Sequence, residues 1–144
     1  MGMRWKVDVI GREKLLKRLE SIPLGVQNAL METMEDLRRC ALGFAPKDTG
    51  HLESSGRVEI RKTKNTIVGS VTYEVTADSY NYAIKMHEGF YNLGDGSRAK
   101  SGGTSKFGVV KHTVGRKYLE EPFKQLLPAY VTHIGEVIER TINT

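Results

Sequence analysis

The feature that most constrains the fold of this 144-residue chain is a long amphipathic stretch that ends at a proline. Within residues 24–44, apolar side chains recur every three or four positions, at Val26, Leu30, Met34, Leu37, Ala41 and Phe44. This spacing gathers them on one face of an α-helix. The residue before a proline is driven away from helical backbone angles, so Ala45-Pro46 should end this helix near Phe44. Such a helix needs a second layer to cover its apolar face.

Segments that alternate between apolar and polar residues predict that second layer. Residues 57–61 and 67–75 alternate in this way on either side of the pair Lys64-Asn65, which offers a turn. They predict an antiparallel β-hairpin with one buried face. Residues 5–9 also alternate, and they predict a short strand that Gly11 ends.

Helical spacing returns in two other places. Residues 12–21 predict a first helix, and residues 118–142 predict a C-terminal helix. Proline removes one backbone hydrogen bond, so Pro128 should kink the C-terminal helix. Residues 82–89 fit either a strand or one helical turn, and both alternatives stay open. We expect one α+β domain over residues 1–144, in which an antiparallel hairpin sheet packs against the long helix and the kinked C-terminal helix.

The net charge of +5 is concentrated in one part of the chain. Residues 91–117, called the basic segment below, hold six basic residues against Asp95 alone, whereas the rest of the chain balances at 16 basic and 16 acidic residues. The six are Arg98, Lys100, Lys106, Lys111, Arg116 and Lys117. Glycine and serine replace hydrophobic periodicity between about residues 90 and 115, so we expect a long flexible loop. Its charge favours contact with a partner or with DNA, and a merely solvated loop is the alternative.

Residues that commonly carry catalysis or bind metals are sparse. Cys40 is the single cysteine and lies within the first predicted long helix, which favours a packing role. The histidines are scattered, without the spacing of a zinc site, at His51, His87, His112 and His133. We therefore expect no enzymatic activity, no metal and no cofactor. No apolar run approaches the ~20 residues that span a bilayer, so we expect cytosolic synthesis and no membrane partner.

Residues 45–55, called the hinge motif below, join the long helix to the predicted hairpin. Their sequence is Ala-Pro-Lys-Asp-Thr-Gly-His-Leu-Glu-Ser-Ser. Asp48 should cap a short turn, and Gly50 allows close approach or a positive φ. Gly56 offers a left-handed exit before the first strand of the hairpin. We expect this motif to determine the fold through Pro46, Asp48, Thr49, Gly50, Leu52 and Ser55, with Ser54 as the alternative to Ser55 if the register slips by one.

The hinge motif resembles that of tailed-phage head–tail joining proteins, which are also called tail-completion, neck or minor capsid proteins. A second segment is similar to the Tyr-Ala…Glu-Gly element of that family, through Tyr82, Ala83, His87, Glu88 and Gly89. Lys117-Tyr118-Leu119 with Pro122 is similar to the aromatic-Leu entry into the family's last helix. The order of these motifs along the chain carries the resemblance, and Phe90 departs from it because a threonine commonly stands there in the family.

This resemblance implies a structural, non-catalytic virion protein at the neck of a tailed bacteriophage or prophage, made in the host cytoplasm. Such proteins assemble as rings by protein–protein docking. The implied partners are further copies of the chain, head-completion or connector proteins, and tail-terminator or tail-tube proteins. The basic segment would face these neighbours or the phage DNA in the channel.

Asp48-Thr49-Gly50 is also the catalytic signature of aspartic proteases, in which two such aspartates share a proton across a dimer. Ile67-Val68-Gly69 imitates the hydrophobic-Gly element that these enzymes carry downstream. The surroundings argue against a protease, because Ala-Pro-Lys precedes the triplet where an apolar strand is required. A helix-rich N-terminal third does not fit an all-β enzyme either.

A nucleic-acid-binding protein is the main alternative function. Basic residues of the basic segment are interleaved with Tyr91 and Phe107 and are followed by Tyr118, a pattern suited to following a phosphate backbone and stacking on bases. The charge does not lie on a recognisable recognition helix. A toxin–antitoxin or generic oligomerisation module of α+β type is a third hypothesis.

Overall fold

The computed structural model describes residues 3–10, 22–47, 50–63, 66–77 and 80–143. They form an α+β fold, as the sequence predicts. Its elements are β1 (Met3–Ile10), α2 (Leu24–Phe44), α3 (His51–Ser54), β2 (Arg57–Lys62), β3 (Thr66–Tyr73), β4 (Thr76–Ala77), β5 (Tyr80–Asn81), α4 (Tyr82–Glu88), α5 (Asp95–Arg98) and α6 (Glu120–Ile142). The predicted helix over 12–21 lies outside the described residues.

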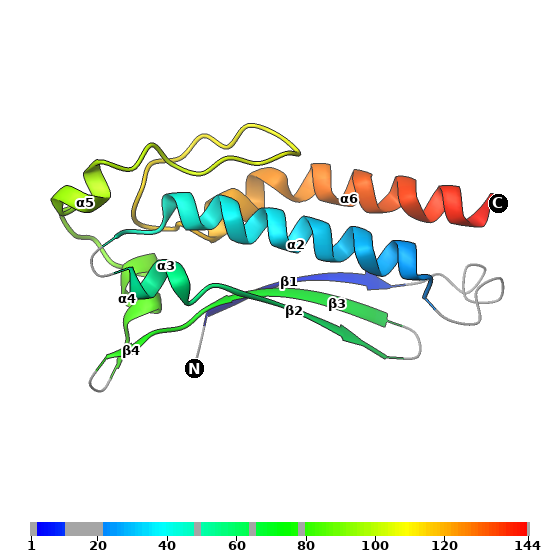
Figure 1. Cartoon of the computed structure of the whole chain (residues 1–144), viewed down its shortest axis with the longest axis horizontal. Coiled ribbons are helices and arrows are strands. Elements are labelled where there is room, and N and C mark those ends of the chain that lie inside the picture. Colours follow the sequence, from blue (N-terminus) through cyan, green and yellow to red (C-terminus); the bar gives the residue numbers. More distant parts are fainter. Residues whose placement is uncertain (1–2, 11–21, 48–49, 64–65, 78–79, 144) are drawn as a thin grey trace.

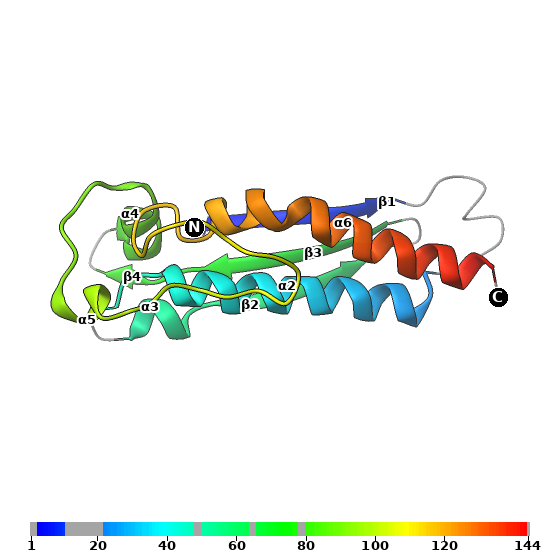
Figure 2. The same cartoon turned by 90° about the horizontal axis from the view of Figure 1, so that it is seen from above.

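The fold has a sheet layer and a helix layer, which lie against each other along their length (Figure 1). The main sheet is antiparallel with strand order β1-β3-β2, so the predicted hairpin and the predicted N-terminal strand are both confirmed. Val7 of β1 and Ile60 of β2 both pair with Gly69 of β3. Helices α2 and α6 run side by side over one face of this sheet (Figure 2).

Helix α2 buries the stripe that the sequence predicts: Val26, Leu30, Met34, Leu37, Ala41 and Phe44 are all at most 3% exposed. A glycine in β3 allows this helix to approach the sheet closely. A Cβ added to Gly69 would lie 2.7 Å from Cγ of Met34 and 3.1 Å from Cγ of Leu30. From α6, the buried apolar side chains are Phe123, Leu126, Tyr130 and Ile134.

Strand β3 is buried on both faces, so the prediction of a hairpin with one buried face is wrong for this strand. Ser70 and Thr72 point away from the helices, yet they are only 4% and 2% exposed. The reason is that β3 is the central strand, with neighbours on both sides. On the β2 side, the long side chains of Arg57 and Glu59 form an ion pair (N···O 3.5 Å) next to them.

The hinge motif ends α2 in the predicted way. Ala45 has extended backbone angles (φ −67°, ψ 136°), and Pro46 follows it. Gly50 has a φ of 87°, which only glycine adopts without strain, and α3 begins at the next residue. Leu52 is buried in the core, and the Ser55 hydroxyl donates to its carbonyl at 2.8 Å. Asp48 and Thr49, with the predicted cap, lie outside the described residues.

The predicted left-handed exit at Gly56 is wrong. Positive φ angles among the described glycines occur at Gly50, Gly102 and Gly115 instead. Gly56 is needed for space, because an added Cβ would lie 2.7 Å from the Cζ atom of the Tyr73 ring.

Two further helices correspond to the predictions for residues 82–89 and for the C-terminal segment. Residues 82–88 form α4, so the helical alternative is the correct one for that segment. The C-terminal helix begins at Glu120, two residues later than predicted, and it continues through Pro128 to Ile142. Pro128 has no N–H, so the carbonyl of Lys124 accepts no hydrogen bond from it.

Candidate interaction surface

The basic segment does not stand free of the fold. Part of it lies across α2 and α6 on the side away from the sheet (Figures 1 and 2). It contains the short helix α5, and Ser97 of this helix is buried against the hinge motif, where its hydroxyl accepts from the Lys47 N–H at 2.8 Å. The structure thus gives the segment fixed attachments that its composition does not predict, and these argue against a freely mobile loop.

Lys100 caps the C-terminal end of α2 with its side chain. Its ammonium group donates to the carbonyls of Leu42, at 2.7 Å, and of Ala45, and it pairs with Glu53 of α3 at 2.8 Å. The last carbonyls of a helix have no partner within the helix and carry partial negative charge, so a lysine is favourable there. The Gly115 N–H donates to a third carbonyl, that of Phe44, at 2.8 Å. Lys100, predicted to contact a partner, therefore has an internal role at the end of α2.

Between these attachments, backbone packs on backbone. A Cβ added to Gly103 would lie 1.8 Å from the carbonyl oxygen of Cys40, and one added to Gly43 would lie 2.3 Å from the Cα of Gly103. Gly102, with a φ of 99°, sets the direction of the chain at this point. Gly102 and Gly103, which suggest flexibility in the sequence, are in fact required by close contact with α2.

Asp36 holds the middle of the basic segment. This carboxylate, 1% exposed, accepts from the Ser105 hydroxyl at 2.5 Å, the Lys106 N–H at 2.9 Å and the Tyr130 hydroxyl at 2.6 Å. Burial, followed by the hydrogen bond and charge of Asp36, raises the pKa of Tyr130. One side chain thus joins α2, α6 and the basic segment. Asp36 is not among the residues predicted from the sequence, although its position three residues after Thr33 and four before Cys40 places it on the buried side of the helix.

The part of the basic segment beyond this attachment is exposed. Val109 is 86% exposed, and Lys106 and Lys111 on either side of it are exposed too. Neither lysine ammonium group has a partner among the described residues. The backbone here is held to α6 through Gln125, whose amide exchanges two hydrogen bonds with Lys111, at 2.8 and 2.9 Å. These two lysines are the predicted contact residues that the structure leaves available to a partner.

Arg98 and Arg116 are exposed but have internal contacts. Arg98 donates to the Leu93 carbonyl at 2.8 Å and pairs with Asp95. Arg116 lies over the ring of Phe90, 4.4 Å from its centroid, and donates to the Glu88 carbonyl at 3.1 Å. Phe90 itself is 88% exposed, so one face of an aromatic ring is displayed beside a guanidinium group.

Lys117 belongs to a cluster at the start of α6. It pairs with Glu88 of α4 and with Glu120 of α6, the latter at 3.0 Å. The hydrogen bond from Lys117 is the main cause that lowers the pKa of Glu88. Lys117 also has a φ of 61°, which is unusual for a residue with a side chain, and its N–H donates to the His87 carbonyl at 2.8 Å. Like Lys100, this predicted contact residue has internal partners.

Residues 82–89, which carry the second part of the family resemblance, form α4 and the residue that ends it. They pack on residues that follow the basic segment. The Tyr118 hydroxyl donates to the carbonyl of Ala83 at 2.9 Å, and its ring contacts His87 edge-on at 5.1 Å between centroids. Both Tyr118 and His87 are fully buried. Gly89 ends the helix where a Cβ would lie 2.6 Å from the carbonyl oxygen of Lys85. This segment therefore joins distant parts of the chain.

Cys40 is buried in the core, and burial, followed by the charge of Asp36, raises its pKa to about 12. A thiol with such a pKa is unreactive near neutral pH. Within the described ranges, no three side chains of histidine, cysteine, aspartate or glutamate are grouped so that they could hold a metal ion. The flanks of the Asp48 triplet are a helix end and the short helix α3, and neither is the apolar strand that an aspartic protease requires.

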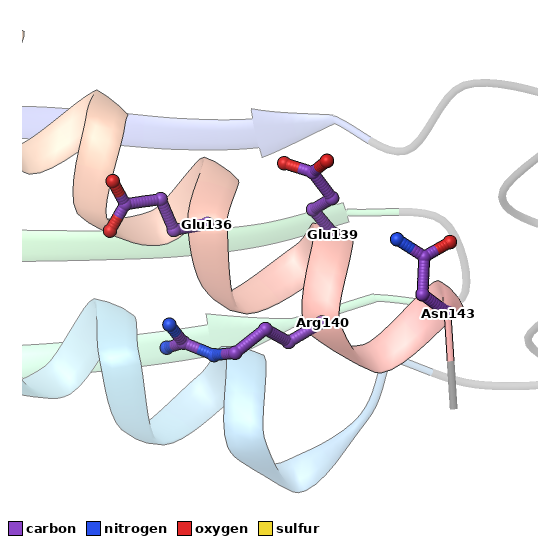
Figure 3. Close-up of a pocket in the computed structure, with 4 residues that line it drawn as sticks. All are labelled: Glu136, Glu139, Arg140 and Asn143. Atoms are coloured by element: carbon purple, nitrogen blue, oxygen red, sulfur yellow. The ribbon is translucent and has the colours of Figure 1, made fainter.

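A shallow depression lies at the C-terminal end of α6 (Figure 3). Its described lining comes from the last turns of that helix and the residue that follows it: Glu136, Glu139, Arg140 and Asn143. In Figure 3 these side chains spread outward from the helix and do not converge on a common point. The depression therefore lacks the convergent polar groups of a binding site for a small molecule.

No helix in the described part of the chain is long and apolar enough to cross a membrane. Comparisons with protein-family models, with curated proteins and with solved structures give no match.

Proposed function

We propose that this protein is a structural component of the neck of a tailed bacteriophage or prophage, where it joins head and tail as a subunit of a ring. The proposal rests on the resemblance of three sequence motifs to head–tail joining proteins. The observation that favours it most is that the three motifs, although far apart in sequence, meet in one region of the fold.

The meeting of the motifs can be followed from contact to contact. The hinge motif lies at the end of α2, and its Pro46 lines one pocket together with Tyr82 of the second motif. The second motif forms α4, and Tyr118 of the third motif donates to the Ala83 carbonyl in it. Motifs that shape one region of a scaffold fit a protein that acts through its surfaces.

A ring subunit needs two different surfaces that fit each other, because contacts of that kind close into a cycle. The elongated shape offers such surfaces, with a sheet on one side and two helices under the basic segment on the other (Figure 1). We assign Lys106, Val109 and Lys111 as the contact of the basic segment with a neighbouring subunit, connector or tail protein. An exposed valine between two cations suits a protein surface that is both apolar and acidic.

Light scattering over a concentration series, at pH 7.5 and with negative-stain microscopy of the same samples, tests ring assembly. We expect a closed oligomer of defined mass, or a monomer that assembles only at high concentration. Lys106→Glu/Lys111→Glu should prevent assembly, whereas Lys62→Glu/Lys124→Glu, a matched pair of exposed lysines on β2 and α6, should leave it intact. A monomer at every concentration, or equal behaviour of the two double variants, would refute the assignment.

Nucleic-acid binding is the second candidate, and the exposed pair of Phe90 and Arg116 favours it. An aromatic face beside a guanidinium group is a stacking platform for a base, and the free lysines could contact phosphates. Titration of the monomer with single-stranded and double-stranded DNA at several salt concentrations separates the two functions. A steep salt dependence that Phe90→Ala weakens would favour nucleic-acid binding, and absence of affinity beside ring formation would favour the neck protein.

A further inference from the structure

The start of α6 is held by a histidine from another helix. Leu119, at the N-cap position, contributes no side-chain cap to α6. The first free N–H of the helix, that of Glu120, donates instead to Nε2 of His87, at 3.1 Å. Glu121 donates to the Lys117 carbonyl at 3.1 Å, and Pro122 has no N–H. His87 therefore supplies the cap that the local sequence lacks.

This contact selects the tautomer of the neutral imidazole ring. Because Nε2 accepts from a backbone N–H, the ring proton of a neutral His87 must be on Nδ1. Nδ1 lies 3.2 Å from Oε1 of Glu88, to which it donates. The carbonyl of His87 also accepts from the Lys117 N–H at 2.8 Å. Side chain and backbone of one buried residue thus hold both the end of the basic segment and the first turn of α6.

A second proton on His87 would break this arrangement. A protonated Nε2 is a donor, so it would face the Glu120 N–H with nothing to accept. The new charge would be buried and would lie at the N-terminus of α6, where the helix dipole is positive. Of the charged groups around the ring, Lys117 opposes protonation, and Glu88 and Glu120 favour it; the fourth neighbour, Tyr118, is a neutral phenol. Burial outweighs the carboxylates, and the pKa of His87 is lowered.

We propose that His87 is a proton-operated latch, which secures the start of α6 and the end of the basic segment when neutral and releases both when protonated. The latch does not depend on the proposed neck function. Because the folded state disfavours the proton, its contribution to stability is complete above the unfolded pKa of about 6.5 and is lost as the pH falls below that value. Between the unfolded pKa and the lower folded pKa of His87, each fall of one pH unit should raise the population of the released state about tenfold.

The experiment combines nitrogen NMR of the histidine ring with amide hydrogen exchange between pH 7.5 and 5.0. In the wild type, we expect His87 to be the Nδ1-protonated tautomer at pH 7.5 and to titrate below 6.5. Protection of the Glu120, Glu121 and Phe123 amides, corrected for intrinsic exchange, should fall about tenfold per pH unit below 6.5.

His87→Gln keeps an acceptor near the Nε2 position but cannot take up a proton, so its protection should not respond to acid. His51→Gln makes the same change at an exposed histidine and should behave as the wild type does. An acid response that survives in His87→Gln would overturn the proposal. The proposal would also be overturned if wild-type His87 titrated near 6.5 and the protection of these amides did not change. That measurement needs only the wild type, so it decides the question even if His87→Gln does not fold. Ring assembly at pH 7.5 is measured separately, so failure of the latch leaves the neck proposal intact.

Discussion

Replacing Gly103 with alanine tests the packing of the basic segment on α2, because this position has no room for a side chain. The added Cβ would lie 1.8 Å from the Cys40 carbonyl oxygen, whereas real contacts of Cβ atoms essentially never fall below 3.0 Å. The obstacle is backbone of a buried helix, which cannot move aside as a flexible side chain would. The segment must therefore retreat from α2 by more than about 1 Å, a distance set by those two values.

The expected cost follows from what the retreat disrupts. Forcing extra atoms into a packed site costs about 1–3 kcal/mol. Retreat also draws Ser105 and the Lys106 N–H away from Asp36, and leaving a buried carboxylate short of donors costs about 1–3 kcal/mol more. The two costs together are about 2–6 kcal/mol. For a chain of this size each kcal/mol lowers Tm by about 2–4 °C, so Gly103→Ala should lower Tm by about 4–24 °C.

Gly108→Ala is the matched control for this variant. Its Cβ would meet only Cδ2 of Leu126, at 3.6 Å, an ordinary van der Waals contact. Both variants restrict the unfolded chain equally, a stabilising effect of about 0.4–1 kcal/mol, so comparison of the two isolates the clash. The measurements are calorimetry and the rate of tryptic cleavage after Lys106 and Lys111, which should rise in Gly103→Ala alone. Equal Tm values and equal cleavage rates in the two variants would refute the argument.

Three further predictions follow from the same region. Asp36→Ala should lower the free energy of unfolding by about 3 kcal/mol, measured in urea, because the buried Tyr130 hydroxyl and the partly buried donors of Ser105 and Lys106 lose their acceptor. Lys100→Met should lower the free energy of unfolding by about 1–3 kcal/mol, because the carbonyls at the end of α2 lose a charged donor. Lys106→Met is the control and should leave that free energy unchanged, because the Lys106 side chain is exposed and has no partner among the described residues. Cys40 should resist iodoacetamide at pH 8 in the native state, because a pKa of about 12 leaves a thiolate fraction of about one in ten thousand, and rapid labelling would contradict this.

Much of the secondary structure was predictable from local sequence. The apolar spacing of α2 and the restriction that Pro46 imposes on Ala45 gave both ends of that helix. Alternation gave β2, β3 and the position of β1. These signals are readable because they depend on the backbone preferences of a residue and on neighbours within a few positions.

The predicted contact residues could not be sorted by sequence, because all six basic side chains look alike there. The structure separates Lys100 and Lys117, which pair internally, from Lys106 and Lys111, which face solvent. The difference arises from partners such as Leu42 and Glu53, which lie 58 and 47 positions away from Lys100. Charge and composition carry no information about contacts of that range.

The sequence by itself determined where helices and strands form, because propensity, periodicity and proline act locally. Only the tertiary structure decided what the glycines and the buried polar groups do. In the sequence Gly103 suggests flexibility, but in the structure it packs closely against α2. Asp36 suggests a surface charge, but in the structure it accepts hydrogen bonds from Ser105 and Tyr130. Likewise, His87 acquires its role only when α4 meets the start of α6. In each case the physical cause is burial, since a buried group needs space and hydrogen-bond partners that distant parts of the chain must supply.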